Sequence, residues 1–199
     1  GSPNAMANPE AMNGGSRRYV IMAVEAALRR LKTDWIDLLQ IHRPDPATPI
    51  EETLRALEDL TRLGKVRYIG CSRFAPWQLV EAQWTARYHE LDAFVSCQEE
   101  YSLVERGPER ELIPVMQNYG VGMLPFFPLA SGLLSGKYQR DKPLPEGARL
   151  TTNKRYAGRY LTDANWKAVE RLDRFCSQRG HSLLELACSW LVSHPVVAT

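Results

Sequence analysis

Segments that favour β-strands alternate with segments that favour helices along this chain, and this alternation most limits the fold it can adopt. Short apolar runs predict strands over residues 35–41, 66–71, 93–98 and 121–127. Strands that alternate with helices pair in parallel through right-handed crossovers. The sequence therefore predicts an α/β fold with a parallel sheet. Apolar residues spaced three and four apart predict helices over residues 16–31, 48–63, 76–89, 108–119, 162–180 and 182–193.

Several of these helices carry terminal signals. Thr48 is expected to cap one helix, with Glu51 completing a capping box, and Gly64 is placed to end it in a left-handed conformation. Ser182 and Glu185 form a second capping box at the start of the last predicted helix. These signals make the helix boundaries more secure than the hydrophobic pattern alone would.

Two segments are less regular. A long loop rich in glycine and proline is expected after residue 127, with helix resuming near Thr162, and a loop of this length usually has a function. The final residues, 196–199, look like the start of one more strand. Residues 1–15 are polar and irregular, which predicts a flexible lead-in, or a scar left by cloning, before a domain over residues 16–199.

Composition excludes several classes of protein. The 199 residues carry a formal charge of only +2, so there is no electrostatic case for binding nucleic acid or an anionic membrane. No apolar run approaches the roughly 20 residues that span a bilayer. The cysteines form no CxxC pair and are expected to be reduced, buried thiols in a cytoplasmic protein, with no metal site. They are Cys71, Cys97, Cys176 and Cys188.

Two α/β architectures compete. A doubly wound nucleotide-binding sheet usually has a glycine-rich turn after a strand, and neither GxGxxG nor GxxxxGK[ST] occurs here. Instead, polar residues follow successive strands, and in a (β/α)8 barrel such positions surround one shared mouth. The sequence therefore favours the barrel. The residues at the strand ends are His42 and Arg43, Ser72 and Arg73, Gln98, and the segment 126–131.

Each of these residues also has a purely structural interpretation. His42 could end a strand at the surface, and Ser72 could be a turn residue or a helix cap. Gln98 could satisfy a backbone group, and Phe126 could belong to the core. The case for a functional site depends on their joint placement at the ends of neighbouring strands.

Four segments in order resemble the aldo-keto reductase family, in the branch that includes potassium-channel β subunits and bacterial reductases. The resemblance covers about residues 16–199. The segments are WIDLLQIHRPD (35–45), GKVRYIGCSRF (64–74), VSCQEEYSL (95–103) and FPLASGLLSGKY (127–138).

The resemblance implies a (β/α)8 TIM barrel that reduces aldehydes or ketones to alcohols with NADPH. In that family a tyrosine, polarised by a lysine paired with an aspartate, protonates the alkoxide, and a histidine orients the substrate carbonyl. Donors must be placed in advance because negative charge grows on the carbonyl oxygen. The cofactor carries the hydride, and the protein supplies its placement.

Carried over by position, His42 matches the family's histidine and is the only catalytic residue predicted. Ser72, Arg73 and Gln98 match positions that hold the nicotinamide carboxamide, and Phe126 matches the aromatic residue that stacks on the nicotinamide ring. The loop along the pyrophosphate and two basic residues near the cofactor phosphates complete the implied site. These are Phe127, Pro128, Leu129, Ala130 and Ser131, with Lys137 and Arg149.

The chain also departs from the family pattern. Arg73 stands where the family usually has asparagine, and Phe127 stands where serine is common. The matched part corresponds to about strands four to seven of the barrel and the start of the eighth, so the tyrosine, lysine and aspartate have no counterparts here. We therefore expect negligible turnover from these 199 residues alone. An open half-barrel would expose strand edges and an apolar interior.

Three explanations remain open for the missing strands: a longer polypeptide, a fragment, or a truncated product that pairs with another chain. The expected partner is a small carbonyl substrate, with no nucleic acid and no membrane, and oligomerisation is possible. The alternative function, suggested by the potassium-channel β subunits, is a non-catalytic nucleotide-sensing or scaffold subunit.

Overall fold

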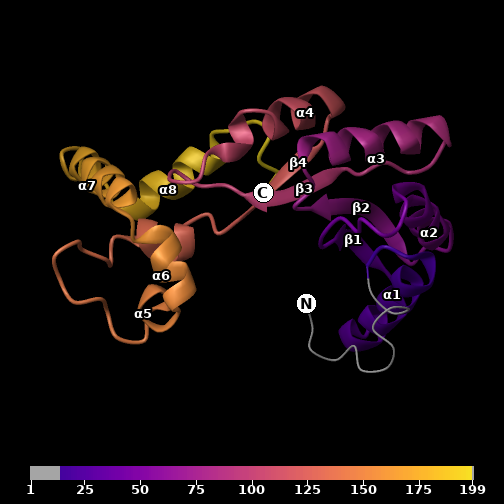
Figure 1. The fold of residues 1–199 in the computed structure, drawn as a ribbon, viewed down its shortest axis with the longest axis horizontal. Coiled ribbons are helices and arrows are strands. Elements are labelled where there is room, and N and C mark those ends of the chain that lie inside the picture. Colours follow the sequence, from indigo (N-terminus) through magenta and orange to yellow (C-terminus); the bar gives the residue numbers. More distant parts are fainter. Residues whose placement is uncertain (1–13, 199) are drawn as a thin grey trace. The chain divides into compact units, whose positions relative to one another are not determined.

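The structure, a computed structural model, describes residues 14–198 and divides them into two compact units (Figure 1). The first unit holds the residues up to Glu99 together with Glu111–Met123, and the second holds Glu100–Arg110 and the residues from Leu124 onward. Most of the expected lead-in, residues 1–13, lies outside the described residues.

The first unit is built on parallel strands, as the alternating pattern predicts. β1 pairs with β2 and β2 with β3, both in parallel, and the sheet order is β1-β2-β3-β4. The chain is therefore an α/β protein with a parallel sheet, consistent with a partial (β/α)8 barrel. Its elements are α1 (Arg17–Leu31), β1 (Ile36–Ile41), α2 (Ile50–Arg62), β2 (Val66–Ser72), α3 (Pro76–Tyr88), β3 (Ser96–Glu100), α4 (Leu112–Tyr119) and β4 (Gly122–Phe126), of which β3 ends and β4 continues in the second unit.

The helices of this unit cover the sheet in chain order. α1 packs against α2, α2 against α3, and α3 against α4. α2 turns Leu54, Leu57 and Leu60 into the core, and they are almost fully buried. The residues of β2 that share this core, Ile69 and Cys71, are buried as well, because alternate side chains of a strand point to opposite faces.

The sheet face away from the helices changes in exposure and polarity along the strands. Leu38 and Tyr68 are partners in the register of β1 and β2, and both are exposed. Two residues further along, Gln40, Gly70 and Ser96 line up across three strands. This face therefore changes from exposed and apolar to enclosed and polar toward the carboxyl ends of the strands.

The second unit is mainly helical and has its own core. Leu133, Leu134 and Leu150 are almost fully buried there, together with Tyr160 and Trp166. α7 packs against α8, and the segment 130–135 contacts α5, α6 and α8. Its helices are two 3₁₀ helices, Gly107–Glu109 and Ala130–Ser135, and α5 (Arg149–Thr152), α6 (Lys154–Tyr160), α7 (Asp163–Ser177) and α8 (Leu183–Val192).

The boundary of β3 differs from the prediction. The strand was expected over residues 93–98 and lies at Ser96–Glu100. Phe94 is held outside the strand because the Gln83 side chain bonds both its backbone N–H (3.2 Å) and its carbonyl oxygen (3.0 Å). Glu100 extends the strand because its buried carboxylate pairs with Arg159 at 2.7 Å, a contact far away in the sequence.

The predicted cap at Thr48 is wrong. α2 begins after Pro49 with no side-chain cap, and the Thr48 hydroxyl donates to the Asp45 carboxylate at 2.7 Å instead. The predicted capping box at the start of α8 is confirmed: the Glu185 amide donates to Ser182 Oγ, and the Ser182 amide donates to the Glu185 carboxylate. Gly64 is left-handed as expected, with a φ of 69°.

Two further boundaries are corrected. The helix expected over residues 108–119 is split into a 3₁₀ turn and α4. The long loop expected up to Thr162 contains the 3₁₀ helix Ala130–Ser135 and the short helices α5 and α6, which gain their stability from tertiary packing. Of the described residues at the end, 196–198, Val197 alone forms a β-bridge and no strand is assigned, while Thr199 lies outside the described residues.

The predicted burial of the cysteines is confirmed for three of the four. All four thiols are free; Cys71, Cys97 and Cys176 are buried, whereas Cys188 is exposed, contrary to expectation. Across residues 14–198, no group of three or more histidine, cysteine or acidic side chains is placed to hold a metal. In that same range no helix has both the length and the apolar character needed to cross a membrane.

Candidate functional site

The first unit brings four predicted residues to the carboxyl ends of its strands. His42 follows β1 directly, Ser72 is the last residue of β2, and Arg73 comes next. Ser72 and Gln98 are partners in the register of β2 and β3, and the Arg73 amide donates to the Gln98 carbonyl at 3.0 Å. Parallel pairing thus gathers side chains that are up to 56 positions apart in the sequence.

The Ser72 hydroxyl has an unusual environment. The residue is almost fully buried, and its Oγ has no hydrogen-bond partner among the described residues. A buried hydroxyl without a partner costs about 1–3 kcal/mol. Such a group is suited to bond a molecule that enters the site, because the cost is recovered when the bond forms.

Gln40 is a polar residue at this end of the sheet that the sequence interpretation missed. Its Nε2 donates to Ser96 Oγ at 3.0 Å, while its Oε1 is buried without a partner among the described residues. The two side chains lie over Gly70, where a Cβ would come within 2.3 Å of Ser96 Oγ. A glutamine close to the carboxyl end of a mainly apolar strand was the signal that could have identified it.

His42 lies in a positively charged environment. Partial burial lowers the pKa of its imidazole below the ordinary 6.5, and the nearby guanidinium groups of Arg43 and Arg73 lower it further. The neutral form of the ring is therefore favoured at neutral pH. A neutral imidazole can donate one hydrogen bond and accept another, which suits it to orient a polar group.

Arg73 occupies a left-handed backbone position, with a φ of 59°. Among residues other than glycine, asparagine and aspartate tolerate this conformation best. The backbone at this position thus suits the asparagine that the family usually has there. Arginine keeps the turn but replaces the amide group with a cation.

A hollow of about 550 Å³ lies beside His42. It runs between α1 and the side of β1 that faces away from β2, and Tyr19, Val20 and Gln40 contribute to its walls. Its lining is largely apolar, with His42 and Arg43 at the polar end.

The second unit holds the remaining predicted residues, in and near the loop that follows β4. Phe127, Ala130 and Ser131 all have positive φ values, between 48° and 57°, and Gly132 has 96°. Such strained residues often cluster at functional sites. The Ser131 hydroxyl is buried and has no hydrogen-bond partner among the described residues, like that of Ser72.

Two cations flank this loop. The Arg149 guanidinium lies 5.8 Å from the Phe127 ring centroid, and Lys137 lies near Gly132, with its Nζ 5.3 Å from the Tyr138 ring centroid. Both residues are exposed. Their charges can pair with phosphate oxygens, which accept strong charge-assisted hydrogen bonds.

The chemistry of each group, taken by itself, suits one part of a nicotinamide dinucleotide. In the first unit a buried hydroxyl beside Gln98, without a partner among the described residues, suits a carboxamide. In the second unit a buried hydroxyl that likewise has no described partner lies in a strained loop with two cations, which suits a pyrophosphate. Phe126, predicted to stack on the nicotinamide ring, is the last residue of β4 and lies edge-on to Phe127 at 5.5 Å.

These features define an α/β protein with a parallel sheet, consistent with a partial (β/α)8 barrel, in which the predicted site residues of the first unit follow the carboxyl ends of the strands. Comparison with known sequences then identifies the family. The model of the aldo/keto reductase family matches residues 5–199, and the chain belongs to that family.

Relatives from several kingdoms share more than a third of their aligned residues with this chain. Versiconal hemiacetal acetate reductase of Aspergillus parasiticus is 36% identical over 92% of the chain and 52% of its own length. A rice (Oryza sativa subsp. japonica) protein named "Probable voltage-gated potassium channel subunit beta" is 36% identical over 94% of the chain and 57% of its own length. Uncharacterized oxidoreductase YrpG of Bacillus subtilis is 36% identical over 95% of the chain and 56% of its own length.

The chain thus spans about half the length of the curated relatives it matches. Relatives named as oxidoreductases support an enzymatic role, and the relative named as a channel subunit adds a second possibility.

Proposed function

We propose that the protein is an NADPH-dependent oxidoreductase that reduces aldehydes or ketones to alcohols by hydride transfer. Family membership supports this proposal, as do relatives named as reductases and oxidoreductases. The single observation that carries it is the buried Ser72 hydroxyl at the end of β2, which has no partner within residues 14–198 and lies next to Gln98, on the same edge as His42. We further propose a cytoplasmic protein acting on a small carbonyl substrate.

In this proposal each residue has a distinct task. His42, neutral at neutral pH, donates a hydrogen bond to the substrate carbonyl oxygen, where negative charge develops. Ser72 and Gln98 hold the carboxamide of the cofactor, and Phe126 covers one face of its nicotinamide ring. When bound, the cofactor supplies the hydride.

The segment 127–131 would hold the pyrophosphate, with Lys137 and Arg149 pairing with phosphate oxygens. Buried Ser131 Oγ would gain a partner there. We propose that the 199 residues alone bind the nucleotide but turn over negligibly, because no counterpart of the family's tyrosine proton donor has been matched among them.

The variant Ser72→Ala tests the assignment of the Ser72 hydroxyl to the cofactor, because the substitution should weaken NADPH binding but raise the free energy of unfolding. NADPH binding should weaken roughly threefold to tenfold, equivalent to about 0.5–1.5 kcal/mol for one hydrogen bond. The free energy of unfolding should instead rise by about 1 kcal/mol, since a buried hydroxyl without a partner is removed. NADPH quenching of tryptophan fluorescence and urea denaturation measure the two quantities.

Ser189→Ala is the matched control for binding, because Ser189 is exposed on α8. It should leave the NADPH affinity unchanged. An unchanged affinity in Ser72→Ala would refute the assignment of Ser72 to the cofactor. Turnover is tested by NADPH oxidation with 4-nitrobenzaldehyde, using material whose intact mass is confirmed as 22.6 kDa, and robust turnover would refute the argument from the proton donor.

The second candidate is a non-catalytic nucleotide-sensing or scaffold subunit. The 36% identity to the rice protein named as a channel β subunit favours it. Nucleotide binding without turnover, together with a stable complex with a partner protein, would distinguish this function from the reductase.

A further inference from the structure

α3 exposes its three aromatic side chains and turns Leu79 and smaller or more polar residues into the core. Trp77, Trp84 and Tyr88 are 65%, 55% and 82% exposed, whereas Ala82 and Gln83 are buried. The buried Gln83 is satisfied by the backbone of residue 94. Exposed aromatic patches of this kind mark interaction sites more often than ordinary surface.

The exposed residues form one stripe along the helix. Trp77, Glu81, Trp84 and Tyr88 are spaced by four, three and four positions, which places them on the same helical face. A carboxylate therefore stands between two indole rings. This combination of aromatic faces and a carboxylate is the chemistry that recognises cations.

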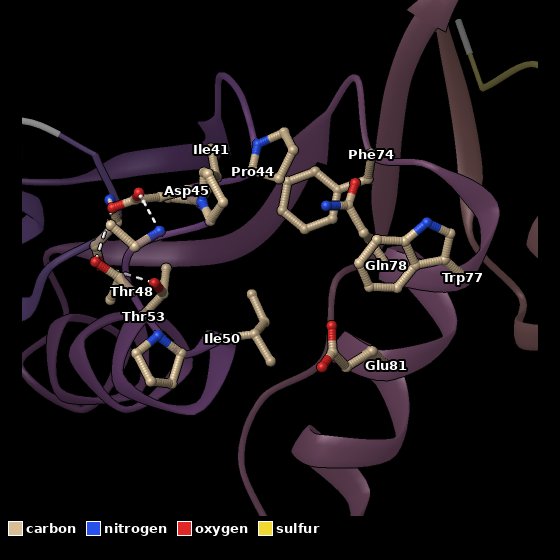
Figure 2. A pocket seen from close by; sticks show the side chains of 14 residues that line it. Ile41, Pro44, Asp45, Thr48, Ile50, Thr53, Phe74, Trp77, Gln78 and Glu81 are labelled. Carbon is tan, nitrogen blue, oxygen red and sulfur yellow. Dashed lines mark hydrogen bonds between the residues drawn. The ribbon is translucent and has the colours of Figure 1, made fainter.

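A groove runs beside this stripe (Figure 2). A hollow of about 460 Å³ has Pro44 and Ile50 on one side and Phe74, Trp77 and Glu81 on the other. A second hollow of about 480 Å³ continues past Trp84 and Tyr88, and both hollows share Pro49, Ile50 and Glu81. We call the two hollows together the α2–α3 groove. Glu81 lies where they meet.

Glu81 is the acidic side chain of the groove that is available to a partner. Within residues 14–198 no cation lies within ion-pair distance of its carboxylate. The other two carboxylates are engaged: Asp45 accepts hydrogen bonds from the amides of Gly15 and Ala47 and from the Thr48 hydroxyl, and Glu51 pairs with Arg55 and His89.

The chain already uses arginine–indole contact one step along the same stripe. The Arg87 guanidinium lies 5.5 Å from the Trp84 ring centroid. Trp77 has the same kind of exposed ring, with Glu81 one turn away as a counter-ion. Arginine suits this site better than lysine because its planar group both stacks on an indole and bonds a carboxylate with two N–H groups.

We propose that the α2–α3 groove binds an extended segment of a partner protein that presents an arginine flanked by apolar side chains. The arginine stacks on Trp77 and pairs with Glu81, and the flanking side chains fill the hollows lined by Pro44, Pro49 and Ile50. The proposal is independent of the proposed reductase activity, because the predicted His42, Ser72 and Gln98 do not line this groove.

The test uses the polypeptide as purified and a synthetic probe, the pentapeptide acetyl-Ala-Leu-Arg-Leu-Ala-amide. Its matched control carries citrulline, which keeps the shape of arginine but has no charge. The arginine peptide should bind about fivefold more tightly, as expected for one exposed ion pair and one cation–π contact. The indole N–H signal of Trp77 should shift in the NMR spectrum, and that of Trp35 should not.

Variants give an independent measurement. Glu81→Gln and Trp77→Leu should each weaken binding of the arginine peptide at least threefold, while the control Glu90→Gln, an exposed carboxylate that lines neither hollow, should not. Circular dichroism checks folding, and the wild-type NMR shifts do not depend on any variant. Equal binding of the citrulline peptide overturns the proposal. So does a dimer in sedimentation velocity that Trp77→Leu dissociates, because the occupant is then a second copy.

Discussion

At the scale of single residues, the candidate site is notable for polar atoms that the fold leaves without partners. Ser72 Oγ, Ser131 Oγ and Gln40 Oε1 are buried and unbonded within the described part of the chain. The sequence singled out both serines through the family resemblance, but only the three-dimensional structure shows that their hydroxyls lack partners. Gln40 could be recognised as part of the site only from the register of three strands, because its hydrogen-bond partner Ser96 is 56 positions away in the sequence.

The ionisation of His42 is predicted to depend on its arginine neighbours. Burial first, and then Arg43 and Arg73, lower the pKa of this imidazole from 6.5 in the folded chain. Folding thus favours the neutral ring, so its contribution to stability is present above pH 6.5 and is lost as the pH falls through the folded pKa. An NMR titration of the His42 Cε1 proton should give a midpoint below 6.5.

Arg43→Gln should raise that midpoint toward 6.5, because one nearby cation is removed. Arg30→Gln, on an exposed position of α1, serves as the control and should leave the midpoint unchanged. A wild-type midpoint at or above 6.5 would contradict the expectation.

At the scale of elements, local signals predicted the central helices and strands well. α1, α3, β1 and β2 lie within one residue of their predicted ends. The errors occur where a side-chain contact that the hydrophobic pattern does not record intervenes: the Thr48 hydroxyl bonds the Asp45 carboxylate, and the Gln83 side chain holds the backbone of Phe94. Short elements such as α5 and α6 depend on contacts with the segment 130–135, which no local pattern records.

Gly70 shows how closely neighbouring strands constrain an element. In Gly70→Ala the new Cβ would lie 2.3 Å from Ser96 Oγ and 2.8 Å from Gln40 Oε1, so these two side chains must move and their hydrogen bond is disturbed. We expect a loss of about 2 kcal/mol in the free energy of unfolding, within the usual range for overpacking. Urea denaturation measures it.

Gly158→Ala is the matched control, since a Cβ at that position of α6 meets nothing within 4 Å. It should stabilise the protein by about 0.5–1 kcal/mol through helix propensity. If Gly70→Ala and Gly158→Ala change the free energy of unfolding alike, the close packing over Gly70 does not explain the effect of the alanine there.

At the scale of the whole molecule, one face of the parallel sheet exposes apolar side chains. Tyr68 is 61% exposed on the sheet face opposite the helices, beside its register partner Leu38. An apolar sheet face favours self-association. This agrees with the expectation that a partial barrel shows part of its interior.

Tyr68→Lys should therefore reduce self-association of the 199-residue chain roughly tenfold, about 1.4 kcal/mol, by removing an aromatic ring and adding charge. Sedimentation velocity over a concentration series measures the effect. Leu63→Lys is the control, because Leu63 is equally exposed but lies at the end of α2, away from this face. An equal effect in both variants would show that net charge alone controls association.

The sequence by itself determined the α/β class, the parallel order of strands and helices, and the segments that carry the family pattern, because these depend on local periodicity and on residues close together in the chain. Only the tertiary structure decided which polar atoms lack partners, where β3 begins, and that α3 turns its tryptophans outward toward a groove. Those properties depend on neighbours distant in the sequence, which are set when the elements pack.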